Sequence, residues 1–235
     1  MKRDRLAPVL AIVGGALVLV VALVVASQIS NKKNPNTSNL NMVSSINEML
    51  QGIPQKGIYL GNPKAKLTLI EFADPQCSAC ASFSENSLPE LIQNYVRTGK
   101  VRIEYQGQTF VDRYAKGSSD SNRLLRMALA AGEQRKLWDF VEIVYANQGA
   151  EDSGYATDSY LKEVAGAIPG LDVNKAFALA SPTSSFAAQI KASANRFNSE
   201  RFGGTPSFMV GPTGGKAQKV SEADLDSRID AQLKK

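Results

Sequence analysis

The chain has 235 residues, of which 43% are hydrophobic, and a formal net charge of +5 that lies mostly in residues 1–33. The remaining residues are nearly neutral, which argues against a nucleic-acid-binding surface. With two cysteines, no histidine and no cofactor motif, the chain excludes c-type haem attachment and histidine-based metal sites, and we expect neither a metal nor a cofactor.

The first predicted element is an uncharged apolar run of 21 residues, Leu6–Ala26. A helix of this length reaches ~31 Å, enough to cross a bilayer core, and the basic residues before it favour a cytoplasmic N-terminus. The run exceeds the 7–15 apolar residues typical of a signal peptide. We therefore predict that residues 1–28 form a cytoplasmic flank and a transmembrane signal anchor. A signal peptide cleaved after Ala26 is the alternative, and both readings export the rest of the chain.

Residues 29–55 are polar and aperiodic, which predicts a flexible linker, with one short helical turn at Ile46–Leu50 packed on the following domain. The first part of that domain is expected at 56–117.

Leu67–Phe72 is apolar and rich in residues that favour β-strands, as in a central strand covered on both faces. A helix from Ser82 to about Arg97 and an alternating strand at Val101–Tyr105 follow, an order that predicts parallel pairing of the two strands.

Residues 118–202 have helical periodicity and no strand pattern, so we predict an all-helical insertion. Trp138, Phe140 and Tyr145 are expected in its core rather than in a binding site, and Asp139 and Glu142 on a solvated face. The five predicted helices carry Leu124–Leu129, Leu137–Tyr145, Tyr160–Ala165, Val173–Leu179 and Ser185–Phe197.

Residues 203–235 are expected to complete the domain. Ser207–Val210 and Lys216–Val220 flank a Gly-Pro-rich turn and predict a β-hairpin. Leu225, Ile229 and Leu233 repeat every four residues and predict a final amphipathic helix. The predicted order is therefore βαβ, helical insertion, ββα.

Cys77-Ser78-Ala79-Cys80 lies where the strand, after the polar turn Asp74–Gln76, passes into the first helix. In this context Cys-x-x-Cys indicates redox chemistry. The helix N-terminus stabilises a thiolate at Cys77, so we predict Cys77 as the nucleophile, facing solvent, and Cys80 as the resolving thiol. A structural disulfide is one alternative, although so small a loop stabilises little. Half of a metal site is the other, and its remaining ligands are missing.

Three segments carry a resemblance to a known family: Gly57-Ile58-Tyr59-Leu60-Gly61, EFADPQCSACASF at 71–83, and Gly203-Gly204-Thr205-Pro206-Ser207-Phe208. From Ile53 to the C-terminus the chain resembles the DsbA-like thioredoxin-fold proteins, most closely their membrane-tethered bacterial branch. The resemblance implies an α/β thioredoxin-like fold with an inserted helical domain. The chain departs from the family at Ser78 and Ala79, where the best-known members carry proline and histidine. The helix terminus is therefore expected to provide most of the thiolate stabilisation.

The resemblance also implies roles for three further residues. Glu71 lies six residues before Cys77, where related proteins carry a buried acid that relays a proton to or from the resolving thiol. The alternative is an edge-strand residue that points to solvent. Thr205 and Pro206 resemble the cis-proline loop that faces the two cysteines, where the backbone of Thr205 pairs with an extended substrate. The alternative there is an ordinary trans turn.

The resulting hypothesis is an extracytoplasmic, membrane-anchored thiol–disulfide oxidoreductase that forms disulfides in exported proteins. The resemblance implies exported proteins with free thiols as substrates and reoxidation by a membrane quinone-linked enzyme of the DsbB or vitamin-K-epoxide-reductase type. Known reduction potentials of such dithiol centres run from about −120 to about −270 mV. The Ser78-Ala79 pair between the cysteines therefore leaves the direction of electron flow open. A reductase or isomerase, or a client-binding chaperone with secondary redox activity, is the alternative.

Overall fold

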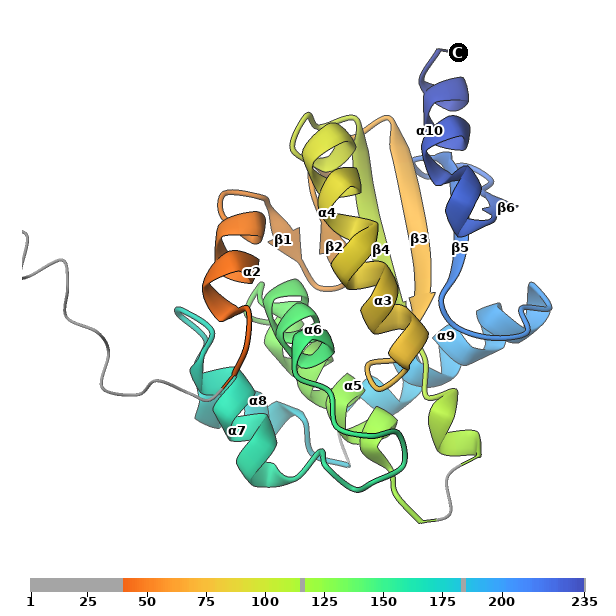
Figure 1. Cartoon of the computed structure of the whole chain (residues 1–235). Helices are drawn as coiled ribbons and strands as arrows, with labels where there is room; N and C mark the ends of the chain where they lie inside the picture. The colour runs from red at the N-terminus through yellow and green to blue at the C-terminus, as the bar shows by residue number, and fades with distance from the viewer. Residues whose placement is uncertain (1–39, 115–116, 183–184, 235) are drawn as a thin grey trace, which may run out of the picture. The chain divides into compact units, whose positions relative to one another are not determined.

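A six-stranded mixed sheet organises the protein in a computed structural model that describes residues 40–114, 117–182 and 185–234 (Figure 1). Within these residues the strand order is β1-β2-β4-β3-β5-β6. The strands are β1 (Gln55–Lys56), β2 (Tyr59–Leu60), β3 (Leu67–Ala73), β4 (Val101–Gly107), β5 (Ser207–Pro212) and β6 (Gln218–Val220).

Strand β3 lies in the centre of the sheet, parallel to β4 and antiparallel to β5. Every residue of β3 is buried, in keeping with its near-continuous apolar sequence. The predicted parallel pair and the hairpin of β5 and β6 are both confirmed. Strands β1 and β2 were not predicted, because two-residue strands are too short to show an alternating pattern.

The first long helical segment begins at Ser78, four residues before its predicted start, because Cys77 itself takes the N-cap position with an extended backbone. The predicted single helix is also divided at Ser87, where Pro89 opens a new first turn. Its three parts are α3 (Ser78–Asn86), α4 (Leu88–Leu91) and the π-helical η1 (Ile92–Val96).

Helices α5 to α9 lie in the chain between β4 and β5, as expected for a helical insertion. Helices α7 and α8 have side-chain N-caps, since Thr157 and Asp172 accept hydrogen bonds from the backbone N–H groups of Tyr160 and Lys175. The remaining elements are α2 (Val43–Leu50), the 3₁₀ turns η2 (Val111–Arg113) and η3 (Glu222–Asp224), α5 (Asp120–Gly132), α6 (Leu137–Ala146), α7 (Asp158–Gly166), α8 (Val173–Leu179), α9 (Phe186–Ser199) and α10 (Leu225–Leu233).

Side chains of β3 alternate between two buried layers. Leu67 and Leu69 pack in the larger core with α3, α6 and α10. Ile70 and Phe72 face the opposite side and pack with Phe197 of α9. Figure 1 shows the same arrangement, with α3 and α4 lying across one face of the sheet and α9 across the other.

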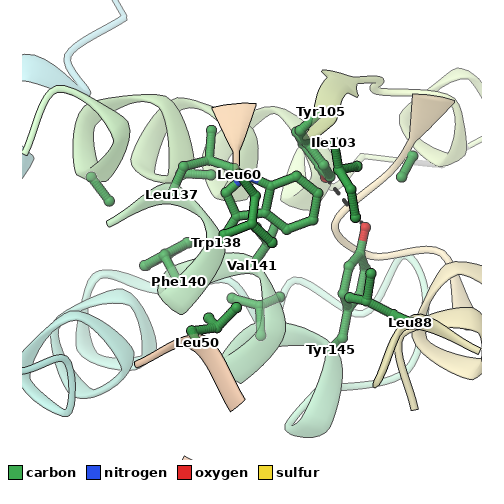
Figure 2. Close-up of a cluster of buried hydrophobic side chains, with 14 of the residues drawn as sticks. Leu50, Leu60, Leu88, Ile103, Tyr105, Leu137, Trp138, Phe140, Val141 and Tyr145 are labelled. Atoms are coloured by element: carbon green, nitrogen blue, oxygen red, sulfur yellow. Dashed lines mark hydrogen bonds between the residues drawn. The ribbon is translucent and has the colours of Figure 1, made fainter. Parts of the chain in front are cut away.

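The helical insertion shares its core with the sheet. Trp138 and Phe140 of α6 are buried in the same hydrophobic core as Leu60 of β2 and Ile103 of β4 (Figure 2). The Trp138 ring packs edge-on against Tyr105 of β4, with centroids 5.8 Å apart. The prediction that these aromatic side chains form core is confirmed, and the core is continuous with that of the sheet.

Two acidic residues of α6 contradict the predicted solvated face, since Asp139 and Glu142 are 4% and 3% exposed. Helix α6 packs against α2, α3, α5 and α7, so it is covered on several sides. Asp139 accepts hydrogen bonds from Gln55 and Lys136, and Glu142 accepts one from Ser84. Buried carboxyl groups require such partners.

Helix α2 shortens the linker expected at 29–55. Ile46 and Leu50 are buried in the main core, which confirms the short helical segment and extends it to eight residues. Strand β1 also begins inside the expected linker, at Gln55. The anchor expected at Leu6–Ala26 lies outside the described residues. Among the residues that the structure does describe, none of the helices is long and apolar enough to span a bilayer.

Candidate active site

Cys77 and Cys80 lie at the N-terminus of α3, and both thiols are free. Cys77 is the N-cap residue and is 8% exposed, whereas Cys80, in the first turn, is fully buried. The predicted order of exposure is therefore correct, but Cys77 is largely covered rather than open to solvent. An attacking group reaches the pair only through the small exposed edge of Cys77.

The segment that covers Cys77 comes from the far end of the chain. The Thr205–Pro206 peptide bond is cis, as the sequence predicted, and the Cys77 thiol donates a 3.4 Å hydrogen bond to the Thr205 carbonyl oxygen. The Thr205 hydroxyl oxygen is buried without a hydrogen-bond partner within the described ranges. Two residues 128 positions apart in the sequence thus meet at one sulfur atom.

The two thiols differ sharply in acidity. A hydrogen bond from the Cys80 thiol is the main cause that lowers the pKa of Cys77 from 9.0 to about 6; Thr205 and the N–H groups of Cys80 and Ala79 lower it further, against the effect of burial. The helix terminus was expected to dominate, but the neighbouring thiol contributes more. Burial and the nearby Cys77 sulfur raise the pKa of Cys80 well above its ordinary value. A thiolate therefore forms at Cys77 first.

Glu71 lies within the central strand and is 2% exposed, so the solvent-facing alternative is wrong. Burial raises the pKa of Glu71 well above its ordinary value, and the charges of Glu142 and Glu222 raise it further. The charge of Glu71 in turn raises the pKa of Cys80. A carboxyl group with a pKa well above its ordinary value thus lies near the inner thiol.

A buried polar layer extends from Glu71 beneath the redox helix. Ser84, one turn after Cys80 on α3, donates a hydrogen bond to Glu142, and burial raises the pKa of Glu142 to about 7. The hydroxyl oxygens of Tyr105 and Tyr145 lie 3.3 Å apart in the same region (Figure 2). Sequence reasoning missed this layer, although a glutamate directly between the apolar residues Val141 and Ile143 was the available signal.

The polar turn before Cys77 is also buried, and both Asp74 and Gln76 have no exposed surface. Asp74 accepts hydrogen bonds of 2.9 Å from the backbone N–H of Gln76 and from the Ser121 hydroxyl of α5. The Gln76 amide donates to the same Ser121 hydroxyl at 2.8 Å. Burial raises the pKa of Asp74 to about 7. This network fixes the turn from which Cys77 begins.

The loop after α6 makes a second set of contacts with the redox turn. The Gln148 side chain donates to the carbonyl oxygens of Pro75 and Cys77, at 2.9 and 3.3 Å. Glu151 accepts a 2.8 Å hydrogen bond from the backbone N–H of Ser78. No periodic or motif signal in the sequence connects this loop with the cysteines, because the contacts depend on how the insertion folds back.

Comparison with known proteins supports the same chemistry. A family model described as thioredoxin matches residues 54–231. Probable disulfide bond formation protein D of Bacillus anthracis is 25% identical over 221 residues, which cover 94% of this chain and 93% of that protein. Oxidised BdbD from Bacillus subtilis has a similar structure, with a TM-score of 0.64, 18% identity and coverage of 78% of this chain and 98% of that one.

The structure of α-DsbA1 from Wolbachia pipientis is similar as well, with a TM-score of 0.61, 18% identity and coverage of 80% of this chain and 96% of that chain. These structural neighbours support a thioredoxin-like α/β fold that carries a helical insertion. The family match extends from β1 into α10 and includes both cysteines and the cis-proline loop. The chain belongs to the thioredoxin family and is a DsbA-like thiol–disulfide oxidoreductase.

Proposed function

We propose that the protein forms disulfides in exported proteins, with Cys77 and Cys80 as its dithiol–disulfide centre. The observation that carries the proposal is the opposite acidity of the two thiols, with the pKa of Cys77 lowered to about 6 and that of Cys80 raised. Stabilising the thiolate of the reduced form makes a dithiol centre a stronger oxidant. An acidic Cys77 thus favours transfer of the disulfide to the substrate.

In the first step, a substrate thiolate attacks the Cys77 sulfur of the oxidised enzyme. The bond between Cys77 and Cys80 breaks, a mixed disulfide forms between the substrate and Cys77, and Cys80 leaves as a thiolate. Cys77 is the sulfur attacked because it is partly exposed, whereas Cys80 is fully buried. The backbone of Thr205 beside Pro206 pairs with the substrate main chain, as its contact with Cys77 supports.

In the second step, another substrate thiolate attacks the substrate sulfur of the mixed disulfide. A substrate disulfide forms and Cys77 leaves as a thiolate, so the substrate loses two electrons and the enzyme gains them. A low pKa makes Cys77 a good leaving group in this step. During reoxidation, the Cys77–Cys80 dithiol transfers both electrons to a membrane quinone-linked enzyme of the DsbB or vitamin-K-epoxide-reductase type.

Glu71 supplies the proton that the first step requires. The Cys80 thiolate is unfavourable in its buried position and must be protonated as it leaves. The Glu71 carboxyl, whose pKa is raised by burial, donates that proton to the Cys80 sulfur and regains one from solvent. During reoxidation the same group accepts the proton of Cys80.

The proposed location is the extracytoplasmic side of the cell membrane, with Leu6–Ala26 as a single membrane anchor. The apolar length of that segment supports the anchor. Relatives named for disulfide bond formation support exported thiol proteins as substrates.

The reduction potential of the full-length protein, measured in a glutathione buffer, tests the direction of electron flow. We expect a value closer to the about −120 mV of DsbA than to the about −270 mV of thioredoxin. The oxidised protein should also restore disulfides to a reduced substrate, and Cys77→Ser should not. A potential close to that of thioredoxin would instead assign the protein as a reductase.

A further inference from the structure

The N-terminus of the redox helix α3 carries a negative side chain. Glu151 comes from the loop between α6 and α7, 73 residues after Ser78, and its carboxylate accepts the Ser78 backbone N–H at 2.8 Å. Ser78 is the first residue of α3, directly after the N-cap Cys77. One of the N–H groups that gives a helix its positive end is thus taken by a carboxylate rather than left for the Cys77 sulfur.

Partly buried contacts on both sides of Glu151 hold it in this position. Before it, the Gln148 amide binds the carbonyl oxygens of Pro75 and Cys77. After it, the backbone N–H of Asp152 donates to the side chain of Gln76, which has no exposed surface, at 2.9 Å. The contact with Ser78 is therefore part of a fixed connection between this loop and the redox turn.

A second buried side chain fixes the C-terminal part of the same loop. Asp120 of α5 is 2% exposed and accepts the backbone N–H groups of Gly154 and Ala156 at 2.8 and 3.2 Å. The loop that carries Glu151 is thus held at 148, 152, 154 and 156 by groups of the redox turn and of α5.

The charges around Cys77 give this carboxylate a chemical effect. The groups that lower the pKa of Cys77 most are the Cys80 thiol, Thr205 and backbone N–H groups, which act against burial, and none of them is a cation. Other acidic groups near the turn include Glu71 and Asp74, which are buried with raised pKa values, and Asp112, which accepts a hydrogen bond from the Gln76 side chain and also has a raised pKa. Glu151 is exposed and makes no ion pair with a cation of the described chain. A carboxylate there opposes a negative charge at Cys77.

We propose that Glu151 is a positioning residue that restrains the oxidising strength of the Cys77–Cys80 centre by placing a carboxylate at the N-terminus of the redox helix. The carboxylate destabilises the Cys77 thiolate and so disfavours the reduced form relative to the disulfide. Solvent screens an exposed charge, which limits the size of the effect. The inference rests on the proposed role of Cys77 but not on the direction of electron flow.

Glu151→Gln and Glu151→Ala in the full-length protein test the proposal. Glutamine removes the charge and retains an acceptor for Ser78, whereas alanine removes both. In a glutathione buffer, the equilibrium of Glu151→Gln should move toward the reduced enzyme by about two- to fivefold, or about 10–20 mV. Absorbance of the thiolate across a pH series should show a lower Cys77 pKa in the same variant.

Glu133→Gln, on the turn after α5, is the matched control, because it changes net charge equally at an exposed acid that makes no contact with the redox turn. It should leave both the equilibrium and the Cys77 pKa unchanged. High salt should reduce the effect of Glu151→Gln.

Equal potentials for Glu151→Gln, Glu151→Ala and the wild type, or a shift toward the oxidised enzyme, would overturn the proposal. A variant that melts earlier with an unchanged potential would do the same, because it would give Glu151 a structural role alone. The reduction potential of the wild type tests the proposed function, whereas the difference between variant and wild type tests the role of Glu151. A wild-type potential typical of a reductase would therefore contradict the proposed function without affecting the Glu151 proposal.

Discussion

Replacing Cys80 tests what makes Cys77 acidic. The hydrogen bond from the Cys80 thiol is the largest cause that lowers the pKa of Cys77 to about 6. Cys80→Ala removes the donor, whereas Cys80→Ser keeps a hydroxyl donor at the same position. We therefore expect the pKa of Cys77 to rise substantially in the alanine variant and less in the serine variant.

The expected change is large enough to measure directly. A thiol with the pKa of about 6 found for Cys77 is about 90% thiolate at neutral pH, whereas one with the ordinary value of 9.0 is about 1% thiolate. Because Thr205 and the helix N–H groups remain in Cys80→Ala, its pKa should lie between these limits. The thiolate fraction at neutral pH should fall several-fold.

The rate of alkylation of the single remaining cysteine, followed over a pH series, reports this pKa. Both variants carry one thiol, so the labelling site is unambiguous. If the Cys80→Ala variant keeps a pKa of about 6, the Cys80 hydrogen bond is not the main cause, and the helix N-terminus together with Thr205 supplies the stabilisation instead.

Three further predictions concern single residues, and a fourth concerns the Leu6–Ala26 segment. Thr205→Val should raise the pKa of Cys77, because it removes a hydroxyl that has no other hydrogen-bond partner among the described residues and is free to donate to the Cys77 thiolate; an unchanged alkylation profile would contradict this. Glu71→Gln should slow turnover and alter its pH profile without slowing alkylation of Cys77; unchanged turnover kinetics would count against the relay. Because burial raises the pKa of Glu142 from 4.5 to about 7, its contribution to stability is complete below about pH 4.5 and is lost as the pH rises through 7. The oxidised wild type should therefore lose about 3 kcal/mol more unfolding free energy over that range than Glu142→Gln, because Asp74 and Glu71 titrate in both proteins; equal slopes in chemical denaturation would refute the assignment. Mass analysis of the cell-derived protein should find the Leu6–Ala26 segment attached, and a mature N-terminus at Ser27 would show cleavage.

The sequence predicts those parts of the site that are marked by the pattern of residues next to them in the chain. Cys77 and Cys80 stand between a β-rich run and a helical pattern, so their place at a helix start follows from neighbouring residues alone. Thr205 and Pro206 were recognised through the family resemblance, and their contact with Cys77 follows from the pairing of β5 with β3. The fold was predictable to the same extent, because its long elements carry clear periodicity.

The parts that sequence did not predict depend on contacts between distant segments. Asp74 and Gln76 have the composition of an exposed turn, yet the insertion covers them and supplies Ser121 as a partner. Glu142 was expected on a solvated face because acidic residues are usually exposed. Its burial depends on how α6 packs against α3, which periodicity within one helix does not reveal.

The insertion has a chemical role as well as a structural one. Ser78 and Ala79 supply no charged side chain between the cysteines, so the acidity of Cys77 depends on neutral donors and on the helix terminus. Cys80 is one such donor, and its position follows from the helix itself. Thr205 is another, but it reaches the sulfur only when β5 pairs with β3. Loops of the insertion then fix the turn before Cys77 and place Glu151 against Ser78. The acidity of Cys77 is therefore a property of the whole fold, and any change that loosens the contact between insertion and sheet changes the redox centre with it.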